Sequence, residues 1–547
     1  MSENNEKSNS LTKAEKLTAS LVLIVLLAYF ICFGIINFKG FARYSMSDMY
    51  EDTLVARLMW EQKTLFPRNY VFGNQYYVIA TPVLSALFYG LTGSQNTSMA
   101  LATTVMSLLI VLSFFWMLTG EVRNRLSLAG ALLALVSCVY APHAVTEDIG
   151  QLFFVMCSYY ACYTITLFLV LGDYLRALKS EKLRPGAMAL SLALCFATGM
   201  QSLRQTCIMV LPILAFELLR AVRNRMKEGH FFPEGNRCPL WRALGYAAAN
   251  LGGCLLIKCL NVPHETIYSG VSIFDGASIR GKFWENWIAL RSVCGFEMAS
   301  GGFGLIYPLL FVFFTGIVLY AIMIMLRRHG EKPDNKTCCW LLLLIGIAAV
   351  VAASLVSSVK TRNIYLFLYY PLIAVSFCIN AEKAGGRGRS LLSLALCVLA
   401  AFNLYFSYGE EVKGSLSNEP TPAQQVCELA ISEGCEYVYG CHSHAAPDIA
   451  VWSDGKLIAG TWQDEIIFKV TPYINIQNIY SLEDYSKALF VFMPWELEGA
   501  RIETEGNGTV LTEIGQFGSY TVCRSSNQLL YPLSWGWYWD PIMGTEQ

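Results

Sequence analysis

Charged residues are scarce in this 547-residue chain. They make up 15% of it, whereas soluble domains carry about 25%. Hydrophobic residues make up 54%, and the mean hydropathy is +0.43. The formal net charge is -1, and no basic face alternates with aromatic side chains, so nothing points to a nucleic-acid partner. This composition excludes an ordinary soluble protein and a disordered chain.

The sequence also lacks paired-cysteine motifs, internal repeats and low-complexity tracts. Eighteen cysteines are present, but none has Cys-x-x-Cys spacing, and most lie inside apolar runs, where a small buried thiol is common. A zinc or redox site built on such pairs is therefore not indicated, and composition alone excludes collagen and coiled coils.

Apolar runs of ~20 residues recur instead, and this length crosses the ~30 Å hydrocarbon core of a bilayer. The first run, 16–38, is long for a signal peptide and no small-residue cleavage site follows it, so we predict an uncleaved span. In total we predict eleven spans, near residues 16–38, 98–118, 127–145, 150–172, 187–202, 204–220, 242–262, 303–326, 338–358, 364–380 and 390–408.

A further apolar run, 76–92, differs because it contains Pro82 and Gly90 and opens with aromatic residues. If it does not cross, the basic clusters of five loops face the cytoplasm, whereas crossing would move all five outside. The positive-inside rule therefore places 76–92 along the outer face as a juxtamembrane or re-entrant helix. The N-terminus is then cytoplasmic and the C-terminus extracytoplasmic. The five clusters are Arg123/Arg125, Arg176/Lys179/Lys182/Arg184, Arg220/Arg223/Arg225/Lys227, Arg327/Arg328/Lys332/Lys336 and Lys383/Arg387/Arg389.

The predicted fold class is mainly α, a polytopic helical membrane protein of about eleven spans with a small extracytoplasmic α/β domain. Residues 1–408 form the transmembrane domain, whose outer loop 39–97 carries juxtamembrane helices. Residues 409–547 are more polar. They begin with a predicted helix at 421–433, and the β-rich runs that indicate the α/β domain follow at 436–439, 456–459 and 488–492.

Two acidic pairs lie in segments that this topology places outside. Asp48 and Asp52 follow the first span at i, i+4 spacing, so they share one face of a helix. Glu147 and Asp148 lie in a very short link between apolar runs, where charge tends to be functional or paired. Two carboxylate sites can divide base work from orienting or metal-binding work. The plainer interpretations are a helix N-cap at the first pair and simple loop polarity at the second.

Cationic residues also lie at the predicted outer ends of spans. Arg204 lies where two short apolar segments meet, Lys258 lies late in the run 242–262, and Arg362 follows Lys360 in a short turn. Arginine binds phosphate through paired hydrogen bonds, and lysine offers a compact charge. Each cation alone could simply extend toward lipid headgroups, but cations and carboxylates on one face fit a phosphate-containing lipid and a group to be deprotonated.

Taken together, these features resemble the GT-C superfamily of polytopic glycosyltransferases, which use lipid-phosphate sugar donors. The resemblance extends over the first 408 residues and includes an outer C-terminal domain. Gln75 and a single Pro82 stand where the protein mannosyltransferases and aminoarabinose transferases have a proline-rich stretch. The matching segments are Asp48-Met49-Tyr50-Glu51-Asp52-Thr53, Leu65-Phe66-Pro67-Arg68-Asn69-Tyr70, Gly73-Asn74-Gln75-Tyr76-Tyr77, Asp148, Gly199 to Arg204, and Arg362-Asn363 followed by Tyr370-Pro371-Leu372.

The resemblance implies that Asp48 is the base that deprotonates an acceptor hydroxyl, with Asp52 as the alternative base. It implies inversion at the anomeric carbon. Asp148, with Glu147, would orient the acceptor or bind a divalent ion, and no other cofactor is implied. Arg204, Arg362 and Lys258 would neutralise the leaving polyprenyl phosphate.

We therefore expect a multi-pass plasma-membrane glycosyltransferase. Its donor is a polyprenyl-phosphate sugar, and its acceptor is an envelope glycan, lipid or protein. The alternative is a transporter or flippase of lipid-linked sugars, which needs the same cations but no base. Movement of labelled lipid across vesicles without bond breakage would favour that alternative.

Overall fold

The computed structural model describes residues 12–68, 70, 72, 75–122, 124–139, 153–158, 160–179, 184–229, 231, 237–260, 262, 279–302, 304–327, 333–358, 361–441, 445–462, 469–470, 484–526 and 531–532. The chain forms two compact units. The helical unit comprises Met1–Gly34, Met106–Leu260 and Gly270–Val412. The mixed unit comprises Ile35–Val105, Asn261–Ser269 and Lys413–Gln547.

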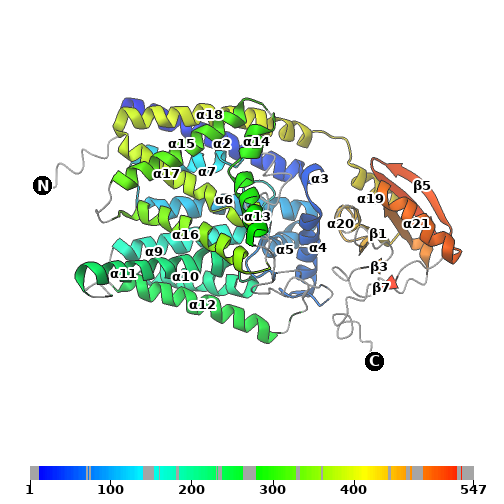
Figure 1. Ribbon diagram of the computed structural model, residues 1–547. Helices are drawn as coiled ribbons and strands as arrows, with labels where there is room; N and C mark the ends of the chain where they lie inside the picture. The colour runs from blue at the N-terminus through cyan, green and yellow to red at the C-terminus, as the bar shows by residue number, and fades with distance from the viewer. Residues whose placement is uncertain are drawn as a thin grey trace. The chain divides into compact units, whose positions relative to one another are not determined.

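Each of the eleven predicted spans has a helix. These helices are α2 (Lys13–Lys39), α6 (Gln95–Thr119), α7 (Arg125–Ser137), α9 (Ala161–Lys179), α10 (Pro185–Gln201), α11 (Leu211–Glu228), α12 (Cys238–Leu260), α15 (Ile306–Arg327), α16 (Asn335–Val356), α17 (Tyr369–Lys383) and α18 (Gly385–Ser415) (Figure 1). Within the described ranges, eight helical segments are long and apolar enough to cross a membrane. The helices α7, α10 and α11 are not among them, and α7 has only 13 residues. The predicted class of polytopic helical membrane protein is confirmed.

The run 76–92 does not form a spanning helix. Its helix, α5 (Thr81–Thr92), has 12 residues, which is about 18 Å of helix against a hydrocarbon core of ~30 Å. Pro82 lies in its first turn, and Gly93 ends it with a positive φ of 68°. Gly90 lies against the Trp60 ring, because a Cβ there would be 2.2 Å from a ring carbon. This helix therefore packs on its neighbour α4 (Ser47–Gln62) within the mixed unit.

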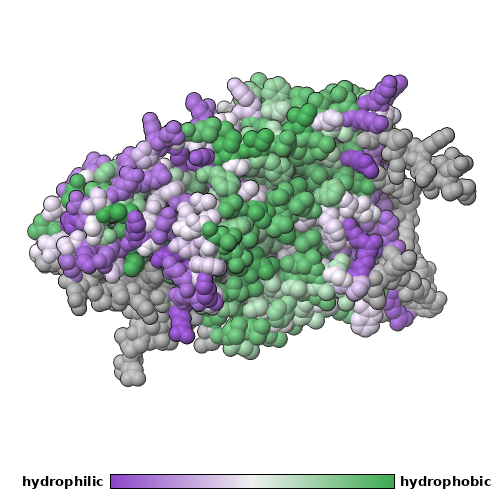
Figure 2. Space-filling view, turned by 180° about the vertical axis from the view of Figure 1, so that it is seen from behind, coloured by the Kyte–Doolittle hydropathy of each residue, from purple (hydrophilic) through white to green (hydrophobic). Residues whose placement is uncertain are grey.

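The surface of the helical unit is apolar over much of its length. Figure 2 shows a broad band of hydrophobic residues over the helices. The spans α2 and α15 contribute Leu23, Ile24, Leu309 and Val312, each more than half exposed, to this apolar surface. Each Å² of such surface would cost about 25 cal/mol in water, so this surface suits contact with lipid.

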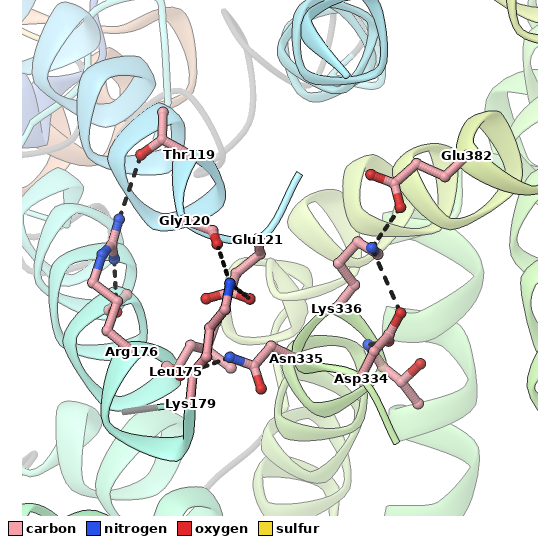
Figure 3. A network of polar contacts seen from close by, with 12 residues as sticks. Thr119, Gly120, Glu121, Leu175, Arg176, Lys179, Asp334, Asn335, Lys336 and Glu382 are labelled. Atoms are coloured by element: carbon pink, nitrogen blue, oxygen red, sulfur yellow. Dashed lines mark hydrogen bonds and ion pairs between the residues drawn. The ribbon is translucent and has the colours of Figure 1, made fainter. Parts of the chain in front are cut away.

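Polar contacts join several helix ends at one end of the helical unit (Figure 3). The Lys179 ammonium donates to the carbonyl of Gly120 at 3.0 Å, and Asn335 donates to the carbonyl of Leu175 at 2.7 Å. Lys336 pairs with Glu382 at 2.5 Å. The C-terminal ends of α9 and α17 and the N-terminal end of α16 therefore lie at one end of this unit. The basic loops at these three helix ends are among those that the sequence assigns to one side of the membrane. Which side of the membrane that end faces stays a prediction.

A buried ion pair joins α9 to α12. Arg242 Nε lies 2.9 Å from Asp173 Oδ2, and the Tyr246 hydroxyl donates to the same oxygen at 2.6 Å. Asp173 and Arg242 are 0% and 3% exposed. Because a charge in such surroundings needs a partner, the pair fixes the register of the two helices.

We expect Arg242→Met to destabilise the protein by about 3–5 kcal/mol, because it leaves the Asp173 carboxylate buried without its cation. Asp173→Asn combined with Arg242→Met removes both charges and restores most of that loss. Thermal unfolding in detergent measures both effects, with Arg225→Met, at an exposed arginine of α11, as the control. Equal transitions for Arg242→Met and Arg225→Met would contradict the assignment.

The mixed unit contains a five-stranded sheet in the order β2-β1-β4-β6-β5. The strands are β1 (Tyr437–Cys441), β2 (Ile458–Trp462), β4 (Ala488–Phe492), β5 (Leu511–Phe517) and β6 (Tyr520–Ser525). β1 pairs in parallel with β2 and β4, and β6 runs antiparallel to β4 and β5. A second small sheet pairs β3 (Lys469–Val470) with β7 (Tyr531–Pro532).

Three helices accompany this sheet: α19 (Pro422–Ser432), α20 (Ala446–Val451) and α21 (Pro494–Asn507). A capping box formed by Thr421 and Gln424 starts α19, as this residue pattern favours. The core beside the sheet contains Tyr439, Trp462 and Phe490. The predicted helix and the three predicted β-rich runs are therefore present.

Candidate functional site

The two candidate bases lie on α4 in different surroundings. Met46 precedes the helix with an extended backbone, and Asp48 lies in the first turn, where a carboxylate is favoured by the helix dipole. The Asp48 side chain is exposed, whereas Asp52, one turn later, is 0% exposed, and Glu51 between them is buried. Solvent therefore reaches Asp48, whereas Asp52 is covered.

Tyr70 faces this acidic turn from the loop that follows α4. Its side chain is 3% exposed. Burial first, and then the charges of Glu51, Asp52 and Asp48, raise the pKa of Tyr70 well above its ordinary value, and a hydrogen bond with Tyr77 opposes this shift. The phenol therefore stays neutral and keeps its proton beside the acids.

The C-terminal part of the mixed unit packs on the first turns of α4. The Tyr50 hydroxyl donates to the Phe41 carbonyl at 3.2 Å. Burial, followed by the charge of Asp448 on α20 and then Tyr520 on β6, raises the pKa of Tyr50. Burial and the charge of Asp448, which also accepts a hydrogen bond from Tyr520, raise the pKa of Tyr520. Asp448 and Tyr520 therefore lie next to the turn that carries Asp48.

The turn after α20 contacts the start of α6 and also the helix α4. Asp454 Oδ1 accepts from the backbone N–H of Gln95 at 2.7 Å. Gly455 has a φ of 95°, and a Cβ there would be 2.5 Å from the guanidinium of Arg57 on α4. Only glycine allows this backbone shape and this close approach, so the turn is fitted to α4.

Arg204 lies at a break between two helices of the helical unit. α10 ends at Gln201 and is followed by Ser202, whose backbone is extended. The chain continues through the π-helix η3 (Thr206–Val210) into α11. The Arg204 guanidinium lies 4.4 Å from the ring centroid of Tyr160 and 5.6 Å from that of Tyr365. Stacking uses the flat face of a guanidinium, whereas its N–H donors lie along the edge.

Gly199 brings α10 and α12 together just before this break. A Cβ at Gly199 would lie 2.1 Å from the Asn250 carbonyl oxygen, and a Cβ at Gly253 would lie 2.1 Å from the Phe196 carbonyl oxygen. The close approach of the two backbones therefore requires glycine at both positions.

Arg362 is exposed and precedes the 3₁₀ helix η4 (Asn363–Leu366). The neighbouring Thr361 hydroxyl donates to Asn286 Oδ1 at 2.7 Å. Asn286 belongs to α13 (Ile279–Val293) and also donates to Ser354 at 3.0 Å. The turn that carries Arg362 is therefore fastened to a neighbouring helix.

The structure brings the segments of two candidate cations together, since Arg204 lies over Tyr365, three residues after Arg362. Lys258 is exposed in the last turn of α12. Arg204, Lys258 and Arg362 belong to the helical unit, whereas Asp48 and Asp52 belong to the mixed unit. Glu147 and Asp148 lie outside the described residues. Among the described residues, no group of three or more His, Cys, Asp or Glu side chains could hold a metal ion.

Sequence reasoning did not single out Tyr70, Tyr160 or Asn286 as parts of these sites. Tyr70 belongs to the segment 65–70, which resembles the GT-C pattern, and nothing else in the sequence indicated a place for it near the acidic residues. Tyr160 and Asn286 carry no local pattern, because each contacts a partner far away in the chain.

The arrangement of helices and sheet is that of known structures. The crystal structure of ArnT from Cupriavidus metallidurans bound to undecaprenyl phosphate matches with a TM-score of 0.55 and 12% sequence identity. The match covers 94% of this chain and 98% of ArnT. The chain has the ArnT fold.

The apo ArnT structure from the same organism gives a TM-score of 0.53 at 12% identity and covers 95% of this chain and 100% of ArnT. No protein-family model and no curated protein matches the sequence. The match with ArnT confirms the fold that was expected from the resemblance inferred from the sequence.

We expect Gly199→Ala to destabilise the protein by roughly 1–3 kcal/mol, the usual penalty of overpacking. The added methyl group meets backbone atoms of Asn250, which cannot rotate away. Gly186→Ala, in the same helix but with nothing within 4 Å of the new Cβ, is the matched control. Thermal unfolding in detergent compares the two variants. Similar stability in both would show that α10 and α12 are not in close contact at Gly199.

Proposed function

We propose that this chain is a glycosyltransferase that moves a sugar from a polyprenyl-phosphate donor to an acceptor hydroxyl at the outer face of the membrane. The observation that carries the proposal is the stacking of Arg204 over Tyr365, which brings the broken span and the Arg362 turn together. The ArnT structure of the same fold holds undecaprenyl phosphate, and a pair of arginines suits such a group.

Asp48 acts as the general base. Its carboxylate takes the proton of the acceptor hydroxyl, and the acceptor oxygen then attacks the anomeric carbon. The bond from that carbon to the phosphate oxygen breaks, and polyprenyl phosphate leaves with the electron pair. A single displacement of this kind inverts the anomeric carbon. The exposure of Asp48 supports this role, because a base must reach the proton it removes.

Arg204, Arg362 and Lys258 bind the donor phosphate. The phosphate gains negative charge as the glycosidic bond breaks, so cations placed there stabilise the transition state more than the ground state. Asp52 is the alternative base, and its burial beside Glu51 favours a supporting role for it.

Glu147 and Asp148 orient the acceptor or bind a divalent ion, and none of the steps above runs through that ion. The acceptor is an envelope glycan, lipid or protein, and the chain lies in a plasma membrane with its C-terminal domain outside.

We expect Asp48→Asn to reduce transfer by about 10²–10⁴-fold, the usual contribution of a general base, while expression and membrane insertion stay unchanged. The measurement is release of polyprenyl phosphate from a labelled donor by the reconstituted protein. Glu61→Gln, at an exposed acid in the last turn of the same helix, is the control and retains activity. Full activity of Asp48→Asn would remove Asp48 as the base, and Asp52→Asn would then be tested.

We expect Arg204→Ala and Arg362→Ala each to lower kcat/KM for the donor by roughly 10–100-fold, because each loses charged hydrogen bonds to a phosphate whose charge grows in the transition state. Initial rates at varied donor concentration measure this effect. Arg225→Ala, at an exposed arginine of α11, leaves kcat/KM unchanged. A kcat/KM that does not move in either site variant would place the donor phosphate elsewhere.

A further inference from the structure

The helix α13 has two different faces. One face is a buried stripe at helical spacing, formed by Lys282, Asn286, Ala289 and Val293. Most of the remaining residues are exposed, although many of their side chains are large and apolar. The exposed apolar residues are Ile279, Phe283, Trp284, Trp287 and Ile288, of which Trp284 and Trp287 are 58% and 45% exposed.

The buried face is bonded to the end of a membrane span. Asn286 donates to Ser354 in the last turn of α16, and Lys282 donates to the Ser357 carbonyl just after that helix. Thr361, the neighbour of Arg362, donates to Asn286. The helix α13 therefore lies against the end of α16 (Figure 1), at the depth where this span leaves the hydrocarbon.

The exposed face is continuous with lipid-facing surface. Val356, the last residue of α16, is itself exposed, and the same end of the span carries α13. Tryptophan is enriched where a bilayer meets water, because its ring suits the layer between acyl chains and headgroups, and tryptophan with phenylalanine is typical of the apolar face of interfacial helices. In water this cluster would be unfavourable by about 25 cal/mol for each Å² exposed.

Charged side chains border the exposed apolar face. Arg280 and Glu285 are exposed, Arg291 is half-buried, and Lys282 lies on the buried face. A helix with a large apolar aromatic face and charged residues beside it is typical of a segment that lies in the headgroup layer of a bilayer.

We propose that α13 lies in the headgroup layer of the bilayer, with Trp284 and Trp287 inserted among the phospholipids, and that it thereby fixes the depth of the Arg362 turn. This interaction surface does not depend on the proposed sugar transfer, because the geometry of α13 is the same whatever reaction the chain catalyses.

The experiment measures tryptophan quenching in vesicles of phosphatidylcholine and phosphatidylglycerol whose acyl chains carry bromine near the headgroup. The full chain and the variant Trp284→Phe/Trp287→Phe are compared, and both substitutions keep an aromatic ring on an exposed face. Trp495→Phe, which removes an exposed tryptophan of α21 in the mixed unit, is the matched control.

We expect the bromine-quenched part of the emission to fall in the double variant and to stay unchanged in Trp495→Phe. Two results would overturn the proposal. Quenching of Trp284 and Trp287 by aqueous acrylamide but not by bromolipid would place the face in water. Protection from both quenchers would show that another protein covers it, such as a second copy of this chain.

Discussion

The backbone of a membrane-spanning chain must satisfy its own hydrogen bonds, and this constraint determines where α10 and α16 can end. Where α10 ends, the Ser202 hydroxyl accepts from the Arg204 N–H at 3.0 Å. Where α16 ends, Asn286 and Lys282 of α13 bond to the residues that follow. Both breaks are thus held by side chains, and each break carries one of the two arginines assigned to phosphate.

The acidic turn depends on a different set of contacts. Asp48 lies on α4, which is not a membrane span, and the much later helix α20 packs against it. Asp454 contacts Gln95, and Asp448 lies near Tyr50. The C-terminal domain therefore forms one compact unit with the loop that bears the proposed base, and this packing gives the domain a structural role within the candidate site.

Structural elements that follow from a regular sequence pattern could be predicted from the sequence. Apolar runs of a set length predicted the helices, the sidedness of basic loops predicted that 76–92 does not cross, and alternation predicted three strands. Contacts between residues far apart in the chain could not be predicted. Nothing in the sequence near Asn286 indicates that it bonds to Thr361, 75 positions away. Spacing also could not separate Asp48 from Asp52. An i, i+4 pair shares one face, but packing covers only the second of them.

The surroundings of Arg204 bear on the cost of the proposed phosphate binding. Its guanidinium lies between the rings of Tyr160 and Tyr365, so its side chain would lose little freedom on binding the proposed donor. Ordering an unpacked long side chain costs up to about 2 kcal/mol. The turn that carries the exposed Arg362 is held through Thr361 and α13. The backbone that presents each of these arginines is therefore fixed by packing before a donor arrives.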